Sequence, residues 1–298
     1  MGERQYSADM INRPDDGVAV EAFYRGTSMA LNRWRCVAGE SGCTGVLRHA
    51  WYVISFTHSG TFVLHARGRA ETIDATRAMV LRPGEPVSMS RCHGAVAYGS
   101  AVAVHPDLFE TIFPNGSAAL TRSGTRAGAF LLQHLLLRMV RAARHEDRRA
   151  VDRAAIWIAG QTILSPGSDT TAAPREKRRD TILGVQAMLA ANCTRPLQLA
   201  EIARAVNRSP FHLSRVFKRD TGLPMHSYLN RLRVRGALDQ LIGRQSSVSE
   251  LAHESGYSSH SHFTEAFRQE FGLAPTEVRR MSRIASVDEM HGALSSMS

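Results

Sequence analysis

Side chains suited to contacts with bases and phosphates cluster in two segments of the C-terminal third of the 298-residue chain. Apolar residues recur at helical spacing in both segments, and placing them on an inward face leaves a set of outward positions. These positions are Phe211, His212, Ser214, Arg215 and Lys218 in the first segment and His260, Ser261, Thr264, Glu265 and Arg268 in the second. A guanidinium such as that of Arg215 can donate two hydrogen bonds to guanine, a phenyl ring can contact a thymine methyl group, and an ammonium group suits a phosphate. We therefore interpret both segments as DNA-contacting surfaces.

The two segments belong to an internal repeat, residues 199–222 and 248–272. Matched positions are Glu201-Ile202-Ala203 with Glu250-Leu251-Ala252, and then Leu213, Phe217 and Gly222 with Phe263, Phe267 and Gly272. The offset rises by one residue between the two groups, so the second copy has one more residue in its turn. Each copy predicts a short helix, a tight turn and a second helix, an arrangement that places the second helix in a DNA major groove.

Capping residues support the helix boundaries of both copies. Ser209 precedes Pro210, Ser247 is followed three residues later by Glu250, and glycines follow the second helices. The helices that we expect in this part are Thr181–Asn192, Leu199–Val206, Pro210–Thr221, Met225–Ile242, Val248–Ser255, Ser259–Phe271 and Thr276–Ser282.

The connector between the two copies has a length that fits DNA. As one helix, residues 225–242 would span about 27 Å at 1.5 Å per residue, and successive major grooves on one face of DNA lie about 34 Å apart. One chain could then place both second helices in adjacent grooves. Arg231, Arg233 and Arg235 on this connector are candidates for phosphate contacts.

Charge favours a polyanionic partner. The chain has a formal net charge of +10 and a pI of about 10.2, almost wholly from arginine, since only Lys177 and Lys218 are lysines. Residues 175–283 hold 18 Lys and Arg against 10 Asp and Glu, a net charge of +8. The positive field is therefore strongest where the repeat lies.

The N-terminal part has a different pattern. From residue 34 to 105, short apolar stretches alternate with Gly- and Pro-containing turns, which predicts a small antiparallel barrel or sandwich. Apolar spacing then predicts helices over Ala127–Ala143 and Arg148–Leu164. We expect a flexible arm at 1–20, a β-rich domain with accessory helices at 21–164, a linker at 165–177, a DNA-binding domain at 178–283 and a flexible tail at 284–298. By the family resemblance that follows, the domain at 21–164 would be a cupin-like effector and dimerisation domain. Trp51, Tyr52 and His65 are candidate effector-binding residues, although each also fits an ordinary core or rim position.

The C-terminal pattern resembles the AraC/XylS family of bacterial transcription regulators over about residues 178–282. The positions that carry the resemblance are Leu199, Ile202, Ala203, Leu213, Phe217 and Gly222, then Tyr228, Arg233, Ala237 and Leu241, then Leu251, Ala252, Gly256, Tyr257, Phe263, Phe267, Gly272 and Pro275. Residues 34–105 resemble, less specifically, the cupin-like effector domain of many members.

The resemblance implies an α+β protein of two domains: an N-terminal cupin-like antiparallel β-barrel with accessory helices, and an all-α domain with two helix-turn-helix units joined by a long helix. It implies promoter DNA and RNA polymerase as partners, a small-molecule effector, and base contacts by Phe211, Ser214, Arg215, His260, Ser261 and Thr264. Glu265 stands where many relatives have a positive residue, and it would either weaken base reading or accept from cytosine N4. Helices at 127–164 often pair two chains in the family, but their leucines fit packing onto the barrel equally well.

Two other functions, metal-dependent catalysis and cysteine chemistry, are alternatives to transcription regulation. The histidines His49, His58, His65 and His93 are scattered, so we expect no catalytic metal, no cofactor and no enzyme activity. Cys36, Cys43 and Cys92 could sense metal or redox change, and a DNA-repair protein could use the same helical module with a zinc-bound thiolate. No Cys-x-x-Cys occurs, and we favour packing roles for these cysteines.

The expected location is the cytoplasm. No apolar run reaches the roughly 18 residues that span a bilayer, and residues 1–16 lack the apolar core of a signal peptide. The sequence thus predicts a cytoplasmic transcription regulator, more in the manner of an activator than of a repressor, with effector and operator unassigned.

Overall fold

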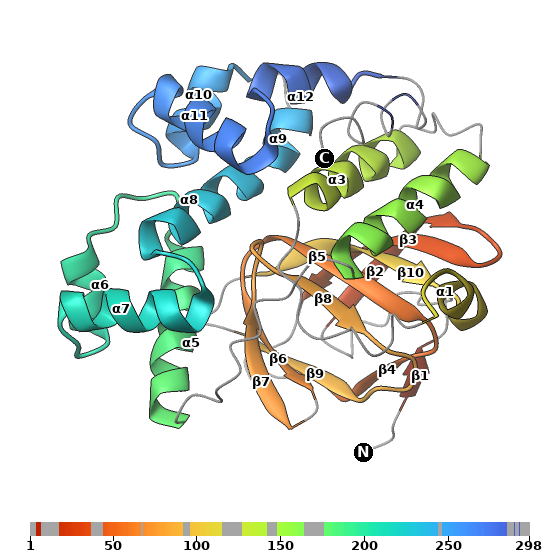
Figure 1. Cartoon of the computed structure of the whole chain (residues 1–298), viewed down its shortest axis with the longest axis horizontal. Coiled ribbons are helices and arrows are strands. Elements are labelled where there is room, and N and C mark those ends of the chain that lie inside the picture. Colours follow the sequence, from red (N-terminus) through yellow and green to blue (C-terminus); the bar gives the residue numbers. More distant parts are fainter. Residues whose placement is uncertain are drawn as a thin grey trace.

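The computed structural model describes residues 4–6, 18–36, 44–66, 68–91, 96–114, 127–141, 148–163, 176–243 and 246–284, together with residues 289 and 292 (Figure 1). Its strands are β1 (Arg4–Tyr6), β2 (Val18–Arg25), β3 (Met29–Cys36), β4 (Leu47–His49), β5 (Tyr52–Ser59), β6 (Phe62–Ala66), β7 (Arg69–Ile73), β8 (Ala78–Leu81), β9 (Val87–Arg91) and β10 (Tyr98–Val104). Its helices are α1 (Pro106–Ile112), α3 (Ala127–Arg141), α4 (Arg148–Ile163), α5 (Glu176–Ala191), α6 (Leu199–Ala205), α7 (Pro210–Thr221), α8 (Met225–Gly236), α9 (Leu238–Gly243), α10 (Val248–Glu254), α11 (His260–Phe271) and α12 (Pro275–Met281).

The N-terminal strands form two five-stranded sheets, ordered β1-β4-β9-β6-β7 and β2-β3-β10-β5-β8. Their ladders are antiparallel except between β1 and β4, which pair in parallel. Side chains of both sheets share one core, in which the Trp34 and Phe62 rings meet edge to face at 5.6 Å. No ladder among the described strands closes the sheets into a barrel. The predicted β-rich N-terminal domain is therefore confirmed, whereas the closed cupin-like barrel is not. Alternating apolar residues predict an inner face but do not decide closure, which depends on strand register and tilt.

Helices α3 and α4 cover the outer face of the sheet that contains β5 (Figure 1). Ile54 and Phe56 of β5 point to this side, and the Phe56 ring lies 6.4 Å from that of Phe130 on α3. Ser55, between them, lines the space between the sheets. Because the sheet is covered on both faces, nearly all of β5 is buried, including the polar Ser55 and Thr57. The two predicted helices are confirmed as α3 and α4.

The leucine stripe of α3 is covered within this chain. Leu131, Leu135 and Leu136 are fully buried, packed against the sheet and the neighbouring helices. The stripe therefore serves packing inside one chain, and pairing of two chains through residues 127–164 would have to use other side chains of these helices.

The C-terminal helices match the predicted boundaries within one residue, except that α5 begins at Glu176 rather than Thr181 and that the connector is divided. The expected single connector is two helices, α8 and α9, that meet at Ala237, although Ala237 keeps helical angles (φ −74°, ψ −17°). The expected arm at 1–20 is partly ordered, since Arg4–Tyr6 pairs with β4 and Val18 begins β2. Strand pairing compensates for the weak apolar pattern of this segment, which is why composition alone predicted a loose arm. Residues 165–175 of the expected linker and most of the expected tail lie outside the described residues, and residues 176–177 of that linker begin α5.

One tight turn of the two packed N-terminal sheets, which we call the sandwich, contacts α8 directly. Between β7 and β8, Asp74 Oδ1 accepts hydrogen bonds from the Thr76 amide (2.8 Å) and hydroxyl (2.7 Å). The Tyr228 hydroxyl donates to Asp74 Oδ2, and Arg235 Nη1 donates to the Ala75 carbonyl at 2.8 Å. Tyr228 and Arg235 lie two turns apart on one face of α8. The two parts of the chain therefore meet through buried, directional bonds.

Among the described helices, none has the length and apolar character to cross a bilayer.

Candidate nucleic-acid interface

Local capping and core packing together set the orientation of α7, the second helix of the first unit. The Ser209 hydroxyl accepts from the His212 amide at 3.3 Å, Pro210 occupies the first turn, and Gly222 ends the helix in a left-handed conformation (φ 78°). Leu213 and Phe217 are buried in the core, as predicted. Because these two residues fix which face points inward, the remaining face of α7 points to solvent.

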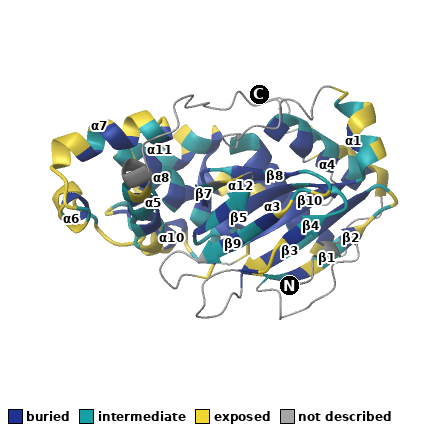
Figure 2. Cartoon of the chain, turned by 90° about the horizontal axis from the view of Figure 1, so that it is seen from below, coloured by how far each residue is buried: buried dark blue, intermediate teal, exposed yellow. Residues whose placement is uncertain are grey.

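That solvent face holds the predicted DNA-contacting side chains. Phe211 is 79% exposed, which is costly for a ring of this size unless a partner covers it. His212, Arg215 and Lys218 are exposed, and Ser214 is half-buried. Within the described residues neither Arg215 nor Lys218 forms an ion pair, so both charges are available to a ligand. Exposed residues are frequent over α6 and α7 (Figure 2).

The second unit repeats this geometry with a weaker charge pattern. In α11 the Ser259 hydroxyl accepts from the His262 amide at 3.3 Å, and Phe263 and Phe267 are fully buried. The predicted outward residues His260, Ser261, Glu265 and Arg268 are exposed and Thr264 is half-buried. The Glu265 carboxylate accepts from Gln269 Nε2 at 3.0 Å, a bond that holds it along the helix surface. His262 is also exposed and lies with His260 in the first turn of α11, but the predicted outward set did not include it.

The connector arginines do not fit the predicted phosphate contacts. Arg231 Nε and Arg235 Nε donate to the Glu270 carboxylate of α11 at 2.9 and 2.6 Å, and Arg235 is only 1% exposed. Arg233 donates to the carbonyls of Cys193 (2.6 Å) and Arg195 (3.0 Å). Burial lowers the pKa of both Arg233 and Arg235. These arginines fasten α11 and the turn after α5 to α8. Apolar spacing within one helix cannot reveal partners on other segments.

The three candidate effector residues do not converge on one cavity. Tyr52 is buried and stacks on Phe109 at 3.7 Å, on the helix-covered side of its sheet. Trp51 lies edge to face with His105 at 5.4 Å, and His65 Nε2 lies 2.8 Å from the Ser90 hydroxyl. The alternation that suggested them could not distinguish the sandwich interior from its outer faces.

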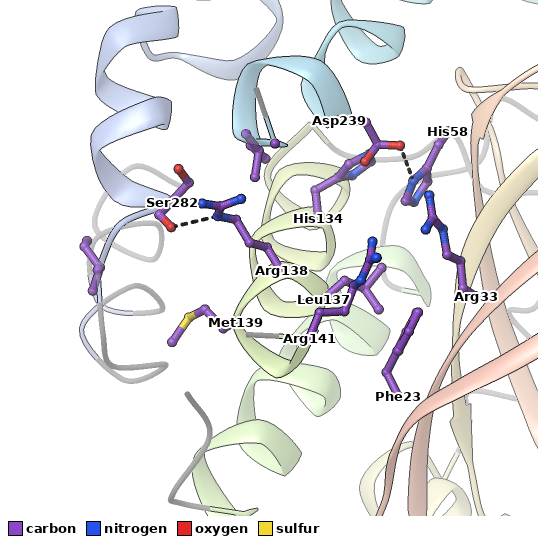
Figure 3. Close-up of a pocket in the computed structure, with 13 residues that line it drawn as sticks. Phe23, Arg33, His58, His134, Leu137, Arg138, Met139, Arg141, Asp239 and Ser282 are labelled. Atoms are coloured by element: carbon purple, nitrogen blue, oxygen red, sulfur yellow. Dashed lines mark hydrogen bonds and ion pairs between the residues drawn. The ribbon is translucent and has the colours of Figure 1, made fainter. Parts of the chain in front are cut away.

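Two cavities involve the N-terminal part. A narrow apolar one of about 70 Å³ lies between the sheets and is lined by residues such as Trp34, Met79 and Met89. A larger one of about 400 Å³ lies between the sandwich, α3 and the C-terminal helices (Figure 3). Arg33, Arg138 and Arg141 contribute to its wall.

The described cysteines lie in packing environments. Cys36 is buried in the core between the sheets, and burial raises the pKa of the half-buried Cys193 thiol. A raised pKa keeps the thiol protonated and therefore unreactive. Cys43, Cys92 and His93 lie outside the described residues.

A polar cluster that sequence reasoning missed opens on the larger cavity. His58 of β5, His134 of α3 and Asp239 of α9 bring their side chains together there (Figure 3). In the sequence, His58 groups only with the other histidines of the strand region, and no local pattern links it to His134 or Asp239.

Residues 202–281 match the family model described as "Helix-turn-helix domain". The HTH-type transcriptional regulator GlxA of Rhizobium meliloti is 28% identical over 133 residues, 44% of this chain and 41% of GlxA. The HTH-type transcriptional activator RhaS of Escherichia coli is 40% identical over 68 residues, 23% of this chain and 24% of RhaS. The crystal structure of a transcriptional regulator with an AraC-type DNA-binding domain from Chromobacterium violaceum is 27% identical and covers 37% of this chain and 97% of its own, with a TM-score of 0.34. The matched segments thus span less than half the length of these curated relatives.

Proposed function

Because this chain belongs to the AraC/XylS family through residues 202–281, we propose that it is a sequence-specific DNA-binding transcription regulator that acts in the cytoplasm. The observation that carries the proposal is the pair of helices α7 and α11, each fixed by two buried apolar residues and each exposing the predicted base-contacting set. Arg215 and Ser214 on α7, and His260 and Ser261 on α11, would face base edges. Lys218 would face a phosphate.

The two units contribute unequally to binding in this proposal. On α7 the exposed Phe211, Arg215 and Lys218 offer one apolar and two cationic contacts. On α11 the exposed Glu265 offsets the charge of Arg268. The first unit therefore supplies most of the base-specific affinity, and the second mainly sets position along the site.

We further propose that a small molecule bound in the N-terminal part controls the DNA-binding helices, and that the chain activates transcription by recruiting RNA polymerase. RhaS, similar over the helical part, is named an activator. The cavity of about 400 Å³ supports ligand control, since both parts of the chain line it and a ligand there can favour one arrangement of the two. We also propose that two chains form a homodimer through solvent-facing positions of residues 127–164.

Selection of genomic DNA fragments by the purified chain, followed by footprinting of the enriched sites, tests the DNA-binding function. We expect two protected major-groove segments about one helical turn, roughly 34 Å, apart. The Arg215→Ala variant should lose protection mainly at one segment. Enrichment no greater than that of random fragments would refute sequence-specific binding.

A further inference from the structure

Three possible metal ligands from separate elements meet where the sandwich contacts α9. His58 Nδ1 lies 3.3 Å from Asp239 Oδ2, and His134 Nε2 lies 3.7 Å from Asp239 Oδ1. The two imidazole rings stack with centroids 3.8 Å apart. Both histidines are 4% exposed, and the Asp239 side chain is 34% exposed toward the cavity (Figure 3).

The hydrogen bonding of His134 leaves a buried nitrogen unmatched. His134 Nδ1 lies 2.8 Å from the Phe130 carbonyl, and a carbonyl can only accept, so Nδ1 carries the proton. The Gln133 side-chain amide also contacts this nitrogen and can turn its oxygen toward the proton. Nε2 is then a lone pair, fully buried and without a hydrogen-bond partner among the described residues.

A carboxylate oxygen of Asp239, Oδ1, lies 3.7 Å from this lone pair. Both atoms are acceptors, so they cannot bond to one another, and leaving a buried acceptor unmatched costs about 1–3 kcal/mol. A cation between them would satisfy both atoms.

His58 has the outer partners typical of a metal-binding histidine. Its Nε2 lies 2.9 Å from the Ser100 hydroxyl and within hydrogen-bond distance of the Gln133 amide, while Nδ1 faces Asp239. Outer hydrogen bonds of this kind fix the ring and leave the other nitrogen for the ion. His134, held by Phe130, follows the same pattern.

The spacing of the donor atoms fits one ion. All three donors lie within 4.8 Å of one another. A tetrahedral ion with bonds of about 2.0–2.1 Å separates its ligand atoms by about 3.3 Å. The observed separations of 3.3 and 3.7 Å are close to this value. Because the two imidazole rings are stacked, at least one ring would have to turn for both lone pairs to point at the ion.

We propose that His58 Nδ1, His134 Nε2 and a carboxylate oxygen of Asp239 bind one divalent first-row transition-metal ion, such as Zn²⁺. Two imidazoles and one carboxylate suit zinc, iron or nickel rather than the all-oxygen coordination of calcium and magnesium. The remaining coordination positions face the cavity, where Arg33, Arg138 and Arg141 favour water or an anionic group.

The site joins the two parts of the chain. His58 and His134 come from the N-terminal part, and Asp239 lies on α9, between the two helix-turn-helix units. A bound ion would therefore fasten α9 to the sandwich. That this fastening changes DNA affinity rests on the proposed function, whereas binding of the ion itself does not.

Metal titration of the tag-free, chelator-treated full chain tests the proposal, with Zn²⁺ followed by calorimetry and Co²⁺ by visible absorption. We expect one ion per chain and cobalt bands of a low-symmetry nitrogen and oxygen site. Asp239→Asn and His134→Ala should each weaken binding by at least about 100-fold, because changes to outer partners alone cost 10–100-fold. His65→Ala, which removes a histidine bonded to Ser90, is the matched control and should bind like the parent chain.

The absence of saturable binding, or binding by Asp239→Asn and His134→Ala equal to that of the parent chain, would overturn the site. Circular dichroism establishes that each variant is folded. If the buried His134→Ala variant does not fold, the near-isosteric Asp239→Asn variant decides the matter, since its side chain is partly exposed. Footprinting with and without Zn²⁺ is a separate measurement, so a chain that binds zinc without binding DNA would refute the proposed function and leave the metal site standing.

Discussion

Replacement of Glu270 by glutamine should destabilise the chain more than its position near the surface suggests. The Glu270 carboxylate is 9% exposed and pairs with two arginines of α8, Arg231 and the fully buried Arg235. Arg235 also donates to the Ala75 carbonyl, and its guanidinium lies 4.8 Å from the centre of the Phe130 ring. Glutamine keeps an acceptor oxygen but removes the charge that balances the buried guanidinium.

The magnitude follows from the burial of Arg235. Removing one partner of a buried ion pair costs about 3–5 kcal/mol. Because glutamine keeps an acceptor oxygen for the guanidinium, we expect Glu270→Gln to cost about 3 kcal/mol, the lower end of this range. Arg231→Gln is the control, because that side chain is 32% exposed. A pair with such a partner contributes at most about 1 kcal/mol.

Thermal unfolding followed by far-ultraviolet circular dichroism measures the difference. At about 2.1 cal/mol/K per residue, 3 kcal/mol lowers the Tm by about 5 °C if the whole chain unfolds as one unit, and by about 13 °C if residues 176–284 unfold alone. Arg231→Gln should shift the Tm by less than a third of the Glu270→Gln value. Equal shifts for the two variants would refute the assignment of the buried charge to Arg235.

Three further predictions concern the helical units. Lys218→Ala should weaken binding to all DNA sequences alike and lower the slope of log affinity against log salt by about one, measured by fluorescence anisotropy at several salt concentrations. Arg215→Ala should relax discrimination at one base position by about 1–3 kcal/mol, and equal losses on matched and altered sites would contradict base reading. Gly256→Ala should destabilise the chain more than Gly272→Ala in urea unfolding: both have positive φ (83° and 73°), but only at Gly256 would a Cβ meet backbone, 2.6 Å from the Thr194 oxygen. Strain from φ alone costs about 1–2 kcal/mol, so similar losses for both glycines would show that this contact relaxes.

Helix boundaries in the C-terminal part were predictable because their determinants are local. The predicted Pro210–Thr221 is α7 to the residue, since a serine cap, a first-turn proline and a glycine stop agree with the apolar spacing. The same residues fix the inward face, so the outward face of α7 also followed from the sequence.

Features that depend on distant partners were not predictable. From the sequence, Arg231 and Arg235 of α8 resembled phosphate contacts, but their partner is Glu270 of α11, which lies 39 and 35 residues further along the chain. In the strand region, the short apolar stretches predicted strands but not whether the sheets close or where a cavity lies. His58, His134 and Asp239 come from a strand and two helices far apart in the chain, so only the fold brings them together.

The turn at residues 74–75 holds two residues of α8 on a single face, and this fixes how motion can pass from one part of the chain to the other. Tyr228 and Arg235 both lie on α8, between the two units, so the turn contacts the connector and neither recognition helix. If α8 and α9 move as one body, a tilt of the sandwich at this contact rotates both recognition helices together and preserves the distance between them. Control exerted through this contact would therefore change the angle at which the protein approaches DNA while leaving unchanged the length of site that it spans.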